Sequence, residues 1–108
     1  MRPLVLLALL VLLVPFRPAA ADDPKIAIVL KNHQWVPNEV PAPAGTKLEL
    51  LIKNEQTEAG EFESDTLHRE KVVPPGGQIS VFVGPLEPGR YEFYDDYHSS
   101  TRGFLVVK

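Results

Sequence analysis

Glu61 and Glu63 flank Phe62 in the segment 54–65, which is rich in acidic residues and contains no Lys or Arg. If this segment is extended, Phe62 faces the core and the two carboxylates share the opposite face. Two like charges held side by side repel each other. A bound cation would relieve that repulsion, and so would exposure of both groups to water, which is the commoner fate of glutamate. The pair is therefore a candidate metal site, and the alternative is a pair of solvent-exposed surface carboxylates.

A second group of potential ligands lies near the C-terminus. Asp95 continues the alternation of Tyr91 and Phe93, so its side chain is expected to point inward. An inward carboxylate needs a partner, which could be a cation or one of three residues: His98, Arg90 or Arg102. His98 follows Asp95 by three residues, and it could equally be a loop histidine bonded to a backbone group.

Carboxylates together with imidazole suit Fe³⁺, Fe²⁺, Mn²⁺ or Zn²⁺, and they accept Cu²⁺ in a tetragonal site. A set drawn from Glu61, Glu63, Asp95 and His98 would be net negative, so its metal affinity should fall as the carboxylates are protonated. Of the other histidines, His33 is interpreted as a turn residue, whereas His68 could approach the site from its own loop.

The composition excludes several classes of function. The chain has no cysteine, so thiol catalysis, thiolate metal sites and redox disulfides are excluded. The formal net charge is −3 and no basic cluster occurs, which argues against nucleic acid as a partner. No Ser-His-Asp spacing and no phosphate-binding loop is present, so the chain is not expected to be an enzyme.

The N-terminus has the order of a secretory signal peptide: Arg2, the apolar run 4–14 and the small residues Ala19-Ala20-Ala21. The apolar run is shorter than the roughly 20 residues that span a membrane. We expect cleavage after Ala21, which leaves one domain over 22–108 in the periplasm or outside the cell. An uncleaved leader would instead anchor the protein to the membrane.

The rest of the chain reads as short strands. Apolar residues alternate with polar ones in 25–31, 47–53 and 78–83, around Tyr91 and Phe93, and at Leu105 and Val107. A period of two is typical of strands with one buried face. Proline and glycine clusters at 41–45, 74–77 and 88–89 indicate turns. The pattern predicts an all-β sandwich or barrel, with at most one helical turn in 63–69.

In several of its sequence motifs the chain resembles the cupredoxin-like domains of the EfeO type. These occur as small exported proteins and as the front domain of a periplasmic iron-uptake component. The matching phrases are Val40-Pro41-Ala42-Pro43-Ala44-Gly45-Thr46, Lys53-Asn54-Glu55, Glu61-Phe62-Glu63-Ser64, Glu70-Lys71-Val72-Val73-Pro74-Pro75-Gly76-Gly77, Gly84-Pro85-Leu86-Glu87-Pro88-Gly89-Arg90-Tyr91-Glu92-Phe93 and the closing segment from His98 to Val107.

The resemblance implies an antiparallel Greek-key β-sandwich with a metal site among the loops at one end. Blue-copper proteins of this superfamily take one His from the middle of the chain and a Cys, a His and a Met from the C-terminal loop. Carried over, the middle ligand falls at Glu61 or Glu63, Asp95 stands at the Cys position and His98 at the second His. The Met position falls near Gly103, which has no donor.

Three of the four blue-copper ligands are therefore absent, and type 1 copper, which needs the thiolate, is rejected. The resemblance implies instead that Glu61 and Glu63 help to bind oxidised iron or copper. The expected function is an exported metal-binding protein for iron (or copper) uptake or handling. It would pass the ion to a membrane iron permease or to a periplasmic binding protein. The alternative is a metal-free sandwich that binds another protein in the cell envelope.

Overall fold

The computed structural model describes residues 22–108, and these form strands and no helix. The strands are β1 (Lys25–Lys31), β2 (Gln34–Val36), β3 (Glu39–Ala42), β4 (Leu48–Asn54), β5 (Gly60–Ser64), β6 (Arg69–Val73), β7 (Gln78–Val83), β8 (Gly89–Asp95) and β9 (His98–Val107). No helix long and apolar enough to cross a membrane is found in this part of the chain. The leader expected at 1–21 lies outside the described residues and stays a prediction.

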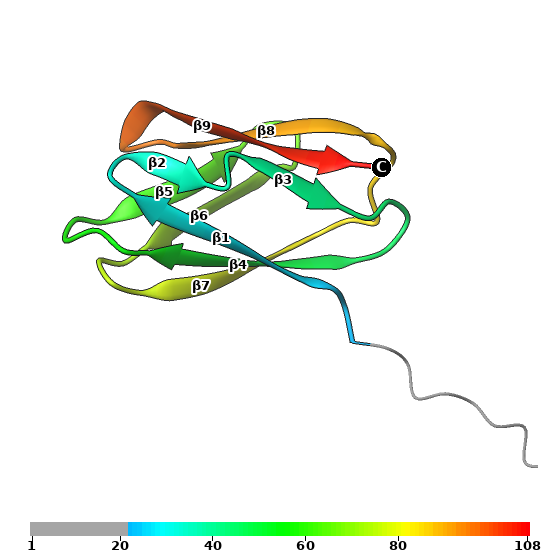
Figure 1. Ribbon diagram of the computed structural model, residues 1–108, viewed down its shortest axis with the longest axis horizontal. Helices are drawn as coiled ribbons and strands as arrows, with labels where there is room; N and C mark the ends of the chain where they lie inside the picture. Colours follow the sequence, from blue (N-terminus) through cyan, green and yellow to red (C-terminus); the bar gives the residue numbers. More distant parts are fainter. Residues whose placement is uncertain (1–21) are drawn as a thin grey trace, which may run out of the picture.

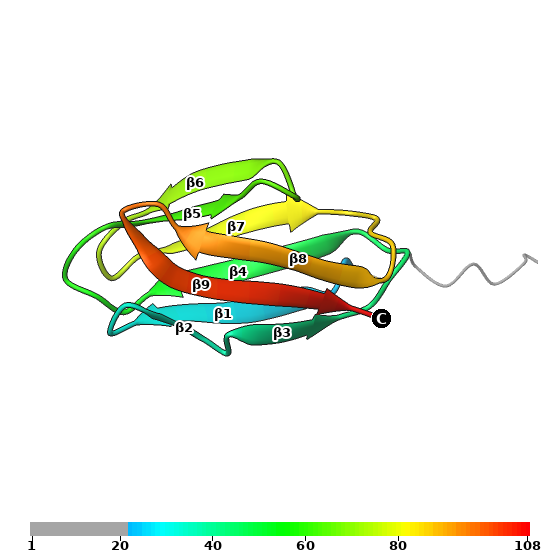
Figure 2. The ribbon, with the colours of Figure 1, turned by 90° about the horizontal axis from the view of Figure 1, so that it is seen from above.

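The strands pack as two sheets, which confirms the predicted all-β sandwich (Figure 1). One sheet has the order β2-β1-β4-β7 and the other β3-β9-β8-β5-β6, as the view from above shows (Figure 2). The resemblance implied purely antiparallel sheets, and that part is wrong: β1 pairs with β4, and β3 with β9, in parallel, so both sheets are mixed. Parallel pairing needs a long connection, and the chain supplies one in each case: residues 32–47 join β1 to β4, and residues 43–97 join β3 to β9.

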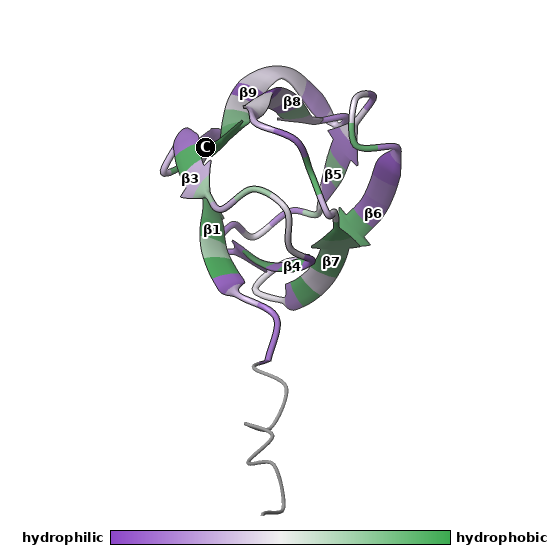
Figure 3. Ribbon diagram, turned by 90° about the vertical axis from the view of Figure 1, so that its right-hand side faces the viewer, coloured by the Kyte–Doolittle hydropathy of each residue, from purple (hydrophilic) through white to green (hydrophobic). Residues whose placement is uncertain are grey.

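The core lies between the sheets and includes most of the predicted alternating positions. Ile28, Leu50, Ile52, Phe93 and Leu105 are fully buried. Each such side chain contributes roughly 1.5–3 kcal/mol of burial free energy. Seen along the strands, the two sheets enclose this interior, and hydrophilic residues dominate β6 at the edge of the sandwich (Figure 3). The period of two in the sequence therefore identifies the buried face correctly.

The observed strand bounds agree with the predicted ones where the apolar alternation is clear. They differ where proline and glycine residues interrupt the alternation. β1 and β7 occupy the predicted ranges, whereas part of the 41–45 turn segment belongs to β3. Pro41 is tolerated there because β3 is an edge strand, where a missing N–H costs little. The helical turn considered for 63–69 is wrong. That segment ends β5, turns at 65–68 and begins β6.

Three aromatic rings fill the interior near one end of the sandwich. Trp35, Phe62 and Phe93 are buried, with ring centroids 5.2–5.9 Å apart. The Trp35 indole Nε1 donates to the backbone oxygen of Thr101 at 3.1 Å. The expectation that Phe62 faces the core is confirmed, and the three rings fix β2, β5, β8 and β9 relative to one another.

Candidate metal centre

Asp95 ends β8 and is buried, with 1% of its surface exposed. Its Oδ1 accepts hydrogen bonds from the backbone N–H of Glu61 at 2.9 Å and of Tyr97 at 3.0 Å. The predicted inward direction is correct, and these N–H groups are the partners that an inward carboxylate needs. The two arginines considered for this role pair elsewhere, Arg90 with Glu39 and Arg102 with Glu92. Asp95 thus ties the start of β5 to the β8–β9 turn.

Glu61 and Glu63 lie on the outer face of β5, opposite to the buried Phe62, as the alternation predicts. The structure brings both together with Glu70 of β6, the register partner of Glu63. One carboxylate oxygen from each of the three lies within 4.8 Å of the others. We call Glu61, Glu63 and Glu70 the acidic centre.

Glu61 is the distinctive member of the acidic centre, because only 7% of its surface is exposed. Its Oε1 is buried and has no hydrogen-bond partner within the described residues. A buried carboxylate oxygen without a partner is costly, because it has lost water and gained nothing in return. Glu61 contributes one of the carboxylate oxygens that cluster with Glu63 and Glu70, so an ion placed there would bind the same carboxylate that holds the unpartnered atom.

The charges around the acidic centre are of one sign. Desolvation raises the pKa of Glu63, and the negative charges of Asp96 and Glu70 raise it further. The pKa of Glu70 is also raised, first by hydrogen bonding to Glu61 and then by the charge of that group. Both shifts report that full ionisation of the centre is unfavourable without a cation.

The basic residues next in sequence to Glu70 do not neutralise the acidic centre. Arg69 and Lys71 lie on the other side of β6, where they donate to backbone oxygens of β7. Arg69 Nε donates to Phe82 O at 2.8 Å, and Lys71 Nζ donates to Ser80 O at 3.1 Å. These bonds hold the edges of the two sheets together and leave Glu70 on the acidic face. No salt bridge between Glu70 and Lys71 is found in the described residues.

His98 begins β9 and is exposed, and it does not belong to the acidic centre. Its ring stacks on His33, with centroids 4.1 Å apart and an interplanar angle of 19°. Its Nδ1 lies 3.1 Å from the hydroxyl of Thr101. Of the four expected ligands, the structure thus groups Glu61 with Glu63 and places Asp95 and His98 in other contacts.

Glu70 is the member that the sequence interpretation missed. Its signal was available, because a hairpin between 60–64 and 69–73 places Glu70 directly across from Glu63. His68, the other histidine considered near the site, is exposed in the β5–β6 turn with φ of 53°.

The family model for the cupredoxin-like domain matches residues 3–107. This chain belongs to the cupredoxin-like domain family. The uncharacterised protein RP394 of Rickettsia prowazekii (strain Madrid E) is 44% identical over 84 residues, which cover 77% of this chain and 67% of that protein.

Solved structures agree on the fold. The metal-binding domain of the Streptococcus pneumoniae D39 Cu(I)-exporting P-type ATPase CopA, solved with Cu(I), superposes with a TM-score of 0.69 at 17% identity. The match covers 83% of this chain and 92% of that one. A reduced amicyanin variant gives a TM-score of 0.64 at 14% identity, with coverage of 82% and 87%. At these identities the likeness concerns the fold alone.

The residues of this cupredoxin-like chain do not fit a thiolate copper site. The chain has no cysteine. The Oδ1 of Asp95 already accepts hydrogen bonds from two backbone N–H groups. Gly103 offers no donor and packs against Phe93, so a Cβ there would lie 2.7 Å from the ring. The acidic centre, in contrast, fits a cation, because its buried oxygen lacks a partner.

Proposed function

We propose that this protein is an exported metal carrier that holds one iron ion at Glu61, Glu63 and Glu70. The observation that carries the proposal is the buried, unpartnered Oε1 of Glu61 beside two further carboxylates. Three carboxylates and no imidazole or thiolate form a hard oxygen set, which favours iron over copper. Asp95 and His98 are left out of this ligand set because both are engaged elsewhere.

The carrier role follows from the exposure of the centre. Glu63 is half-buried and Glu70 is exposed, so an ion held there would remain open to water and to an acceptor protein. Val72, the register partner of Glu61, is also exposed at 46%. An acceptor such as a membrane iron permease or a periplasmic binding protein could contact this apolar side chain while taking the ion. The expected leader at 1–21 supports export.

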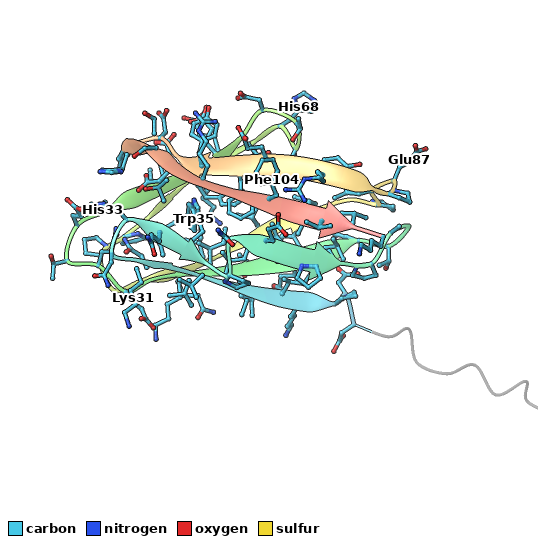
Figure 4. All side chains as sticks on the ribbon, turned by 45° about the horizontal axis from the view of Figure 1, so that its top comes forward. Lys31, His33, Trp35, His68, Glu87 and Phe104 are labelled. Atoms are coloured by element: carbon cyan, nitrogen blue, oxygen red, sulfur yellow. The ribbon has the colours of Figure 1, made fainter. Side chains whose placement is uncertain are left out.

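Isothermal titration of the purified, metal-stripped protein with Fe³⁺ citrate, Cu²⁺ and Zn²⁺ tests the proposal. One-to-one binding of iron is expected, and Glu61→Gln should weaken it because the substitution removes one charged ligand. Glu87→Gln is the matched control, since it makes the same chemical change at an exposed residue near the opposite end of the sandwich (Figure 4). Iron binding that is equal in both variants would overturn the assignment of the centre.

Absence of saturable iron binding to the unmodified protein would favour the second reading, a metal-free interaction module of the cell envelope. One observation favours that reading. Asp95 stands at the position of the blue-copper Cys ligand, yet its Oδ1 accepts hydrogen bonds from two backbone N–H groups. The search would then move to proteins that bind the face bearing Val72.

A further inference from the structure

β7 is an edge strand that carries no charged residue. It stands at one end of the order β2-β1-β4-β7, so only one of its two sides pairs with another strand of its sheet. Its sequence, Gln78-Ile79-Ser80-Val81-Phe82-Val83, contains no proline or glycine and consists mostly of β-branched and aromatic residues. Segments of this composition, when they lie on an open sheet edge, readily pair with a strand of another chain. The free side of β7 is therefore a surface for self-association unless something covers it.

The free side of β7 presents the backbone groups of Ser80 and Phe82. In an antiparallel pair, alternate residues bond to the partner strand and the residues between them point away from it. The backbone oxygens of Ser80 and Phe82 accept hydrogen bonds from β6, which belongs to the other sheet. These two residues are therefore the ones that point away from β4. Their N–H groups lie on the same side and are available to a further strand.

Two basic side chains of β6 occupy both of these oxygens. Figure 3 shows β6 and β7 at the same edge of the sandwich, where each is the last strand of its own sheet. Arg69 Nε donates to Phe82 O at 2.8 Å, and Lys71 Nζ donates to Ser80 O at 3.1 Å. A strand that approached β7 would have to displace both donors before it could bond to the oxygens. The displaced cations would lose their acceptors, which is unfavourable wherever the new strand also excludes water.

Further contacts hold this cover in place. The Arg69 Nη1 donates to the backbone oxygen of His68 at 2.9 Å, so the guanidinium is tied to the turn before β6 while its Nε reaches β7. Lys47 adds a third positive charge, with its Nζ 5.1 Å from the centroid of the Phe82 ring. Phe82 is 45% exposed, and this cation covers part of the apolar surface that would attract a second strand. Charged side chains at a sheet edge prevent pairing between chains.

We propose that Arg69 and Lys71 close the free edge of β7, and that this edge, once open, pairs with β7 of a second copy of the chain. The two strands would run antiparallel about a two-fold axis at Val81. Ser80 of each copy then lies opposite Phe82 of the other, and each such pair exchanges two backbone hydrogen bonds. A second copy fits because an uncharged edge of this kind is complementary to itself. With both side chains in place, the protein is a monomer.

Sedimentation velocity of the full chain over a range of protein concentrations tests the proposal. The double variant Arg69→Ala/Lys71→Ala should form dimers with an affinity at least about ten-fold higher than that of the unmodified protein. Lys31→Ala/Lys53→Ala is the matched control. It makes the same change in net charge at two exposed lysines of β1 and β4, which are not edge strands. This control should stay monomeric.

Amide hydrogen exchange followed by NMR identifies the strand that pairs. The N–H groups of Ser80 and Phe82 should exchange quickly in the unmodified protein. In Arg69→Ala/Lys71→Ala they should become protected as the protein concentration rises. Adding Ser80→Pro to this double variant removes an N–H that the dimer needs and no bond to β4, because proline is tolerated where the N–H faces solvent. The triple variant should be monomeric again.

The proposal is overturned if Arg69→Ala/Lys71→Ala is as monomeric as Lys31→Ala/Lys53→Ala. It is also overturned if the double variant associates while the amides of Ser80 and Phe82 still exchange quickly, since another surface would then be responsible. If circular dichroism shows that the double variant is unfolded, Lys71→Ala, which keeps the contacts of Arg69, is compared with Lys53→Ala by the same two criteria.

This proposal is independent of the proposed iron centre. Glu70 lies between Arg69 and Lys71 in the sequence, but it faces the acidic centre on the other side of β6. Glu61→Gln should therefore leave the protein monomeric. A change in self-association without a change in iron binding concerns the edge of β7, and the reverse concerns the acidic centre.

Discussion

Replacement of Asp95 by alanine should destabilise the fold rather than act only on metal binding. The substitution leaves the backbone N–H groups of Glu61 and Tyr97 without their acceptor. A hydrogen bond to a charged group contributes about 1.5–3 kcal/mol, and an orphaned buried donor costs a similar amount. The Glu61 bond is buried and carries the full cost, whereas the Tyr97 bond is partly buried and carries less. The expected loss in free energy of unfolding is therefore about 3–4 kcal/mol.

Urea denaturation of the metal-free protein measures this loss directly. For a domain of this size, a change of 1 kcal/mol shifts the melting temperature by about 4–8 °C, so Asp95→Ala should melt roughly 15–25 °C lower. Asp95→Asn is the matched variant, because its amide oxygen can still accept from both N–H groups. We expect it to lose about 1 kcal/mol, the difference between a charged and a neutral acceptor.

The sequence analysis named Asp95 as a candidate metal ligand, and a ligand role leads to the opposite expectation: Asp95→Ala would abolish metal binding and leave the fold intact. Equal stability of Asp95→Ala and the unmodified protein, together with loss of iron binding, would refute the structural argument. It would return Asp95 to the ligand set. A large loss of stability in Asp95→Ala that Asn largely repairs would support the role of its carboxylate as a backbone acceptor.

Further predictions concern the acidic centre and the packing beside it. The pKa values of Glu63 and Glu70 are raised above 4.5 in the folded state, so between 4.5 and the raised values the folded protein binds more protons than the unfolded chain. Its free energy of unfolding should therefore fall as pH rises through this window, and melting curves across acidic pH without metal should show that slope. Saturation with iron should raise the melting temperature at neutral pH, because the ion binds only the folded state. Glu61→Gln should show little of that rise, which thermal melts of both proteins with and without iron would measure. Gly60→Ala should cost about 1–3 kcal/mol by urea denaturation, since its Cβ would lie 2.5 Å from the side chain of Leu30; an unchanged midpoint would show that Leu30 moves aside freely.

Local chemistry in the sequence determined much of the architecture. The alternation of apolar residues specifies which side of each strand is buried, because successive side chains of a strand point to opposite faces. For the same reason the sequence alone predicted that Asp95 points inward and that Glu61 and Glu63 share the face opposite Phe62. The absence of cysteine alone excluded a thiolate copper site.

Only the tertiary structure decided what these side chains meet. Glu70 joins Glu61 and Glu63 through the register of β5 with β6, and Asp95 finds its partner in the N–H of Glu61, 34 residues away. His33 meets His98 because the β1–β2 turn and the start of β9 lie at the same end of the sandwich. The direction of a side chain is a local property of its strand, whereas its partners depend on strand register and loop path, which are set by the packing of the whole domain.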